Sequence, residues 1–189
     1  MKVGILEGII SNAYLFNGEY KKAIDGFKAA ISSFDDIVDG VEKDVANKHK
    51  LTAINGMMIA MKRLGNNSDA VALCHEAFNN IETTCPQHFP IIITLCSILI
   101  ELYQDSLKKD DTVFTEICNK LSILLSSESM DHETKGYVYC VYGSLYMAIE
   151  DNVSAKQYYQ TAKKEFLVVN SRYLNEVEQA LDLLENNCD

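Results

Sequence analysis

Proline and glycine are scarce in this sequence, with 2 prolines and 9 glycines among 189 residues. Both residues interrupt regular structure, so their scarcity permits long helices and argues against a turn-rich β fold. The chain is 48% hydrophobic and 23% charged, which is the composition of a folded protein rather than a disordered one. Its length suffices for one domain with a substantial core, and we expect that domain to be all-α.

Positive charge is also in short supply. Lys and Arg total 17 against 27 Asp and Glu, which gives a formal net charge of −10. Such a field repels phosphate backbones and anionic lipid. We therefore expect this chain by itself to bind neither nucleic acid nor a membrane.

Paired metal ligands are missing from the sequence. The six cysteines form no C-x-x-C pair, and most of them lie in apolar helical runs, where a reduced cysteine behaves as a small hydrophobic residue. The segment Cys85-Pro86-Gln87-His88 offers two ligands, but no second pair has matching spacing, and the other histidines are scattered. We expect an ordinary loop there and neither a metal site nor a disulfide framework.

The sequence also lacks a charged-then-apolar leader, and its longest apolar run, Ile91 to Ile100, is shorter than a bilayer span. Together with the reduced cysteines, this indicates a cytoplasmic location.

Motifs of catalysis are absent as well. The sequence contains no phosphate-binding glycine-rich loop, no G-x-S-x-G and no H-E-x-x-H. The acidic pairs Asp35-Asp36 and Asp110-Asp111 lie at expected helix ends, where they serve as caps and solvated turns. The methionines Met57, Met58 and Met61 have the spacing of core-filling residues. We expect no enzymatic activity and no cofactor.

What the sequence does contain is helical periodicity along almost its whole length. The pattern predicts helices over residues 1–16, 19–34, 41–64, from about 68, 91–108, 113–125, from 131, and from a Ser171 cap to about 186. Ile5, Ile9, Ile10, Ala13 and Tyr14 are spaced as one broad apolar face of the first helix. Gly65 and the basic residues Lys62 and Arg63 end the long third helix, and Asn67 or Ser68 is the predicted cap of the fourth.

One side-chain pattern recurs in the second helix of each successive pair. It reads Ala155-x3-Tyr159-x2-Ala162 near the C-terminus, and it returns as Ala23-x3-Phe27-x2-Ala30 and Ala70-x3-Cys74-x2-Ala77. The third pair matches least well, with Phe114, Cys118 and Leu121 in the key places. Small residues at this spacing let two antiparallel helices approach closely, and the aromatic residue fills the space beside them.

The best copy resembles the tetratricopeptide repeat, whose pattern is W-x2-L-G-x2-Y…A-x3-F…P. Gly143, Tyr146 and Ala155 match this pattern directly, and the places of Trp, Leu and Phe are taken by Tyr139, Tyr142 and Tyr159. In the first pair, Ser11 stands where the glycine would be. Repeats of about 42 residues exceed the usual length of about 34, which resembles the elongated repeats of kinesin light chains and of bacterial peptide-sensing regulators.

The resemblance implies a fold, namely a right-handed α-α superhelix of about four helical hairpins with a C-terminal solvating helix. It predicts a single domain over 1–189, with repeats at about 1–36, 41–84, 88–126 and 131–169 and a capping helix at about 171–187. Because the first repeat begins at once, we also expect the chain to be part of a longer regulator.

The first helix of each hairpin would line a concave binding groove. The residues that the resemblance places there are Ile5, Ile9, Asn12, Phe16, Thr52, Asn55, Ile59, Lys62, Arg63, Tyr137, Val141, Ser144 and Met147, with Ile98, Leu102 and Asp105 as the third repeat's contribution.

These residues imply a peptide- or protein-binding groove. The amides of Asn12 and Asn55 can each donate to and accept from a peptide backbone, and the apolar neighbours supply pockets. Gly8, Tyr137 and Val141 stand where a carboxylate clamp of Lys and Arg would be needed, so a chaperone's C-terminal tail is not the expected ligand. The function we expect is a non-enzymatic peptide-binding module, such as the sensory or scaffolding part of a bacterial regulator. The alternative is a homo-oligomer in which helical faces of two chains pair and the groove has no peptide ligand.

Overall fold

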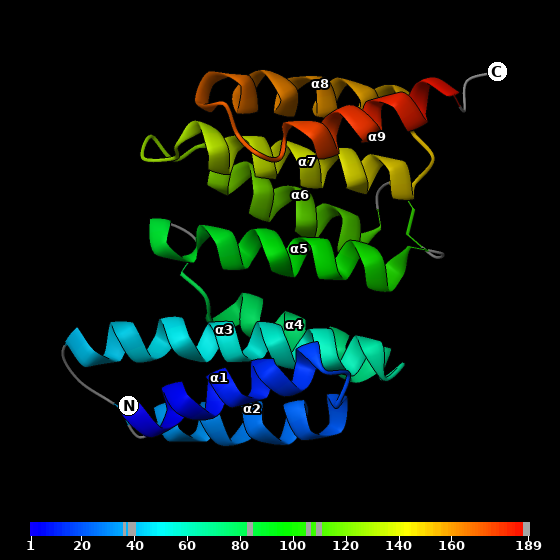
Figure 1. Ribbon diagram of the computed structural model, residues 1–189. Coiled ribbons are helices and arrows are strands. Elements are labelled where there is room, and N and C mark those ends of the chain that lie inside the picture. The colour runs from blue at the N-terminus through cyan, green and yellow to red at the C-terminus, as the bar shows by residue number, and fades with distance from the viewer. Residues whose placement is uncertain (36, 38–40, 83–84, 105–106, 109–110, 187–189) are drawn as a thin grey trace. The chain divides into compact units, whose positions relative to one another are not determined.

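The computed structural model describes residues 1–35, 37, 41–82, 85–104, 107–108 and 111–186, and in these ranges it contains helices and no strand (Figure 1). The expectation of an all-α chain is confirmed. The helices are α1 (Lys2–Phe16), α2 (Tyr20–Asp35), α3 (Val41–Arg63), α4 (Asn67–Asn80), α5 (Phe89–Tyr103), α6 (Thr112–Leu125), α7 (His132–Ala148), α8 (Asn152–Val169) and α9 (Leu174–Asn186), and the 3₁₀ turn η1 (Pro86–His88) precedes α5.

Contacts divide the chain into two compact units, Met1–Ile81 and Glu82–Asp189. We call them the N-terminal unit, which contains α1 to α4, and the C-terminal unit, which contains η1 and α5 to α9. The superhelical arrangement of repeats and the single domain over 1–189 stay predictions, and each unit is described by itself below.

In the N-terminal unit, α1 and α2 form an antiparallel hairpin, and α3 packs against both of them (Figure 1). The Asn17-Gly18 turn joins the first two helices, and Gly18 has a φ of 77°, which glycine adopts without a steric cost. Ala23, Phe27 and Ala30 of α2 have no exposed surface and form the centre of the core with residues of α3.

In the C-terminal unit, α7 and α8 form the most closely packed hairpin, and α9 packs against α8 and shares a core cluster with residues of both helices. The side chains of Asp131 and Asp151 cap the two helices by accepting hydrogen bonds from the backbone N–H groups of Thr134 and Ser154, at 2.7 and 3.0 Å. The end of α8 is the left-handed residue Asn170, with a φ of 50°.

The recurring pattern lies in the core in all three of its better copies. The Ala-Cys-Ala set of α4 and the Ala-Tyr-Ala set of α8 are buried in the same way as the set in α2: Ala70 0%, Cys74 0%, Ala77 2%, Ala155 0%, Tyr159 6% and Ala162 0% exposed. The pattern therefore marks the same structural position in three helices, although it does not by itself establish the repeat family.

Small residues opposite aromatic rings explain how the hairpins close. A Cβ atom built on Gly143 of α7 would lie 2.7 Å from the Tyr159 ring of α8, and one on Gly56 of α3 would lie 2.4 Å from the Phe27 ring of α2. In the first hairpin the small residue is on the other helix, because a Cβ on Gly26 would lie 2.3 Å from the hydroxyl of the buried Ser11.

Two helix boundaries differ from the prediction. Helix α5 begins at Phe89 rather than Ile91, since Pro90 lies in the first turn, where a helix needs no backbone N–H donor. It ends at Tyr103 rather than at Lys108: the N–H of the buried Leu107 still donates to the Tyr103 carbonyl at 2.8 Å, whereas the N–H of Lys108 donates to the Asp111 carboxylate at 3.0 Å.

Two predicted caps also differ. Helix α4 begins at Asn67, and the capping residue is Asn66, which makes no side-chain cap bond. Asp111 occupies the cap position of α6, but its carboxylate accepts from Lys108 rather than from the helix. Asp36 and Asp110, which complete the two acidic pairs predicted at helix ends, lie outside the described residues.

We expect Gly143→Ala to destabilise the chain, because the new methyl group has no room against the Tyr159 ring. The free energy of unfolding should fall by about 1–3 kcal/mol in urea titrations followed by circular dichroism. Gly8→Ala is the matched control, since no side chain and no neighbouring helix lies within 4 Å of its Cβ position. The control should gain about 0.5–1 kcal/mol from helix propensity, and equal effects of the two changes would contradict the close approach.

Candidate functional site

The predicted groove residues of α1 lie on one side of the helix and differ in exposure. Ile5 is half-buried and contacts the core of the N-terminal unit, and Asn12 is half-buried beside it. Ile9 and Phe16 are 60% and 87% exposed. The four residues that the resemblance placed in the groove therefore share one strip of the helix, which runs from the edge of the core into solvent.

A second strip of α1 carries exposed apolar residues that the sequence interpretation placed on the broad apolar face or overlooked. Val3, Leu6 and Ile10 are 65%, 58% and 46% exposed, and Ala13 is exposed beside them. The residues predicted on one broad apolar face differ in their surroundings, because Ile5 and Tyr14 pack against the core whereas Ile9, Ile10 and Ala13 are exposed.

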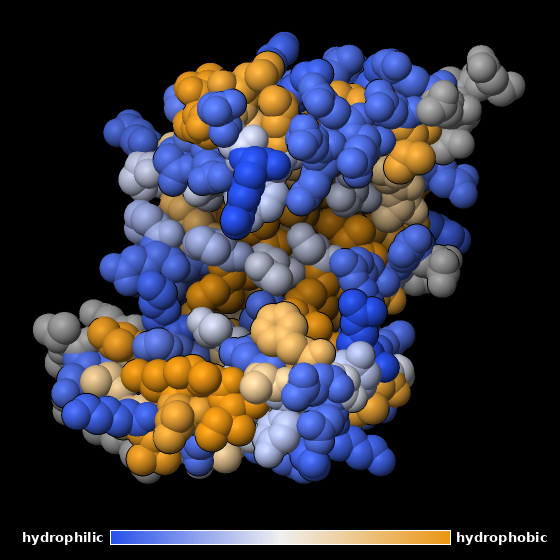
Figure 2. All heavy atoms as spheres, viewed as in Figure 1, coloured by the Kyte–Doolittle hydropathy of each residue, from blue (hydrophilic) through white to orange (hydrophobic). Residues whose placement is uncertain are grey.

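The reason is that α1 is apolar on nearly all sides. Gly4 and Ser11 are the buried residues of the helix, and Ile5, Tyr14 and Leu15 pack at the edge of the core, while Val3, Leu6, Ile9 and Ile10 are exposed. Figure 2 shows the resulting hydrophobic area over α1. A surface of this kind is uncommon on a monomeric protein and typically marks an interaction site.

The groove residues predicted in α3 are mostly polar, and they belong to the same N-terminal unit as α1. Thr52 is exposed, and its hydroxyl donates to the Lys48 carbonyl at 2.9 Å. Asn55 is half-buried, and its Oδ1 atom is buried without a hydrogen-bond partner among the described residues. An unsatisfied buried carbonyl oxygen is rare in native structures and costs about 1–3 kcal/mol, so it requires an explanation.

The C-terminal end of α3 is basic. Ile59 and Lys62 are half-buried, and Arg63 is exposed. Burial, with a smaller contribution from the neighbouring Arg63, lowers the pKa of Lys62 from its usual value. An acidic group placed here would gain from both cations.

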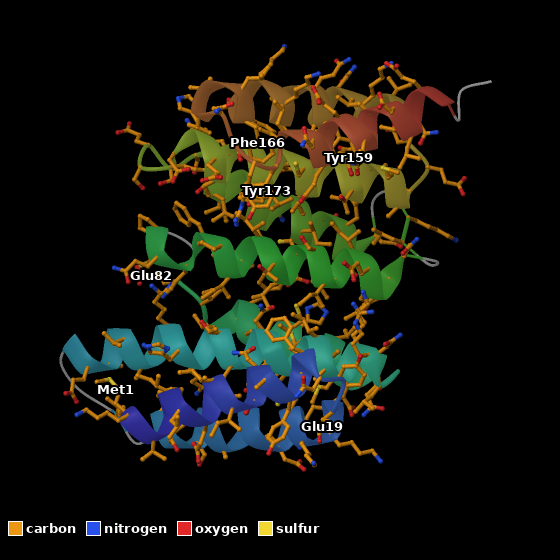
Figure 3. All side chains as sticks on the ribbon, viewed as in Figure 1. Met1, Glu19, Glu82, Tyr159, Phe166 and Tyr173 are labelled. Atoms are coloured by element: carbon orange, nitrogen blue, oxygen red, sulfur yellow. The ribbon has the colours of Figure 1, made fainter. Side chains whose placement is uncertain are left out.

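The predicted residues of α7 are engaged inside the C-terminal unit. Val141 is only 6% exposed, and the Ser144 hydroxyl lies 3.0 Å from the hydroxyl of Tyr159. The Tyr137 ring meets Phe166 and Tyr173 edge-on, at centroid distances of 5.5 and 4.7 Å. Figure 3 shows the labelled side chains of Tyr159, Phe166 and Tyr173 gathered around α7.

Tyr137 and Tyr173 also form a polar pair. Tyr173 accepts hydrogen bonds from the Tyr137 hydroxyl and from the Arg172 guanidinium, and both bonds lower its pKa. The pKa of Tyr137 is raised, first by burial and then by its bond to Tyr173. This arrangement fixes the start of α9 against α7, which is a structural role that the sequence did not reveal.

Met147 differs from the other predicted α7 residues because it lines a shallow depression of about 590 Å³. The depression lies within the C-terminal unit, and its other lining residues are Gln104, Leu107, Lys108, Ala148, Ile149 and Glu150. Of the residues predicted for the third repeat, Ile98 is buried, Leu102 is half-buried and Asp105 lies outside the described residues.

No group of three or more metal-ligating side chains is found in the described ranges of the chain. The segment Pro86–Tyr103, which combines η1 and α5, is by length and composition apolar enough to cross a membrane, contrary to the expectation from the shorter run Ile91 to Ile100. The core helix of a soluble protein passes the same test, and eight residues of α5 are buried.

Comparison with protein-family models, with curated proteins and with solved structures gives no match for this chain. The functional argument therefore depends on the geometry described above.

Cys140 of α7 offers a test of how firmly the α7 surface is closed. Burial, together with the Glu176 carboxylate, raises the pKa of its thiol to about 12. Because the thiolate is the reactive form, iodoacetamide at about pH 8 should modify Cys140 slowly in the folded chain and rapidly in urea. The rate in the folded chain should rise with pH towards 12, as followed by mass spectrometry of the Cys140 peptide. Rapid modification of the folded chain at the lower pH would show that this surface opens.

Proposed function

We propose that the chain is a non-enzymatic interaction module that binds an extended segment of a partner protein along α1 and α3 of the N-terminal unit. The observation that carries this proposal is the exposed apolar strip of α1, with Ile9 and Phe16 at 60% and 87% exposure. Burying one such side chain contributes about 1.5–3 kcal/mol, so two or three of them suffice for specific recognition.

The polar residues specify the kind of ligand. When the half-buried Asn55 side chain turns towards a bound segment, its Oδ1 atom, which has no hydrogen-bond partner among the described residues, can accept a hydrogen bond from a backbone N–H of that segment, whatever the side chains of the segment are. Asn12 on α1 offers a second amide for the same purpose. Lys62 and Arg63 at the end of α3 favour an acidic residue in that part of the segment. The proposed ligand is thus an extended peptide with apolar side chains and at least one carboxylate.

The wider interpretation, a tetratricopeptide-like scaffold from a bacterial regulator, is supported by the buried Ala-x3-aromatic-x2-Ala pattern in α2 and α8. In that interpretation Tyr137, Val141, Ser144 and Met147 of α7 remain predicted contacts of the same ligand class. Their existing contacts within the C-terminal unit make α1 and α3 the first place to test.

A peptide array probed with the purified full chain should identify binding segments, and Ile9→Ala and Phe16→Ala should each weaken that binding. We expect a loss of about 1–2 kcal/mol for each change, since an exposed side chain contributes to binding and little to folding. Ile123→Ala, which alters an exposed isoleucine of α6, is the matched control. Binding that Ile123→Ala weakens and the α1 changes leave intact would place the site elsewhere.

Asn55→Leu separates binding from stability. Removing an unpaired buried oxygen should raise the free energy of unfolding of the unliganded chain by about 1–3 kcal/mol. The same change should weaken the binding of the peptides found on the array, because a backbone N–H of the peptide loses its hydrogen-bond acceptor. Urea titration and fluorescence anisotropy measure the two effects, and a variant that is both less stable and equally good at binding would refute the role assigned to Asn55.

A further inference from the structure

The outer strip of α1 has the spacing of a helix-pairing seam. Val3, Leu6, Ile10 and Ala13 follow one another at intervals of three, four and three residues, which are the a and d positions of two heptads. All four are exposed on the N-terminal unit. This spacing suits another helix better than an extended peptide, because the side chains form one straight row along the axis.

The seam is flanked by Ile9 and Phe16, so the full apolar surface is broad. Together the six side chains expose on the order of 600 Å² in one chain, or about 1,200 Å² for two such surfaces in contact. That area reaches the lower end of the range for specific protein interfaces, whereas the seam residues alone would not.

Charge indicates which partner fits. The chain carries a net charge of −10, but the only charged side chains of α1 are Lys2 and Glu7. The Glu7 carboxylate already accepts a hydrogen bond from Ser33 at 2.9 Å. Two copies can therefore meet at this surface without bringing their acidic residues together, and a chain with net negative charge is otherwise a poor partner for itself.

We propose that a second copy of this chain covers α1, with the two α1 helices antiparallel. In an antiparallel pair centred between Leu6 and Ile10, Leu6 lies opposite Ile10 of the second copy, and the larger Val3 lies opposite the smaller Ala13. Antiparallel helices also place opposite ends of their dipoles together. A parallel pair would instead join Ala13 to Ala13, which leaves one end of the seam poorly filled, and would place the two N-terminal positive ends side by side.

The pairing goes beyond the proposed peptide binding and uses two of the same side chains. Ile9 and Phe16 are at the edge of the pair and become covered in the dimer. A partner segment that binds these residues therefore competes with the second copy, and dimerisation regulates access to the site.

Sedimentation equilibrium of the full chain from about 1 to 100 µM tests the pairing. The wild-type chain should show a monomer–dimer equilibrium, and Leu6→Lys should weaken the dimer by about tenfold or more, because a lysine would face an apolar residue across the seam. Leu183→Lys is the matched control, since Leu183 of α9 and Leu6 are both 58% exposed. This control should leave the equilibrium unchanged.

The antiparallel register has its own test. Leu6→Lys and Ile10→Glu should each weaken the homodimer, and mixing the two variants should restore a heterodimer, because Lys at position 6 then faces Glu at position 10. In a parallel pair the mixture would gain no such ion pair and would stay monomeric.

A wild-type chain that is monomeric over the whole range, or a dimer that Leu6→Lys leaves intact, would overturn the proposal. A monomer that still binds array peptides would leave the peptide-binding proposal standing. Loss of dimer without rescue in the mixture would refute the antiparallel arrangement.

Discussion

The close approach of a small residue to an aromatic ring is the constraint on which both units depend. Gly143 against Tyr159 and Gly56 against Phe27 bring their helices near enough for the alanines beside each ring to be fully buried. Between α1 and α2 the glycine is on the second helix, where Gly26 lies close to Ser11 of α1. A chain without tryptophan and with few prolines thus builds its core from narrow helix contacts, each of which a single methyl group would disturb.

The same constraint decides which surfaces are available. In α7 the ring contacts of Tyr137 and the hydroxyl contact of Ser144 use the residues that a peptide groove would need. In α1 the fully buried positions are the small residues Gly4 and Ser11, so four large aliphatic side chains, Val3, Leu6, Ile9 and Ile10, remain exposed. These side chains are available to a partner.

Binding and self-association are linked in this view. Ile9 and Phe16 belong to the strip that suits a peptide, and they also flank the seam that suits a second α1 helix. The unpaired oxygen of Asn55 remains a feature that only an additional hydrogen-bond donor would satisfy. A module with these properties would exchange its contact with a second copy of the chain for a contact with a partner protein.

Residue patterns by themselves determined the all-α class, most helix ends, and the burial of Ala23, Phe27 and Ala30, because each follows from local backbone chemistry or from strong periodicity. They did not determine which side of α1 faces the core, since a helix that is apolar all round has no preferred side until α2 and α3 pack against it. The engagement of Tyr137 depended on Tyr173, 36 residues along the chain. Those outcomes required the tertiary structure, because they arise from contacts between residues that no local pattern connects.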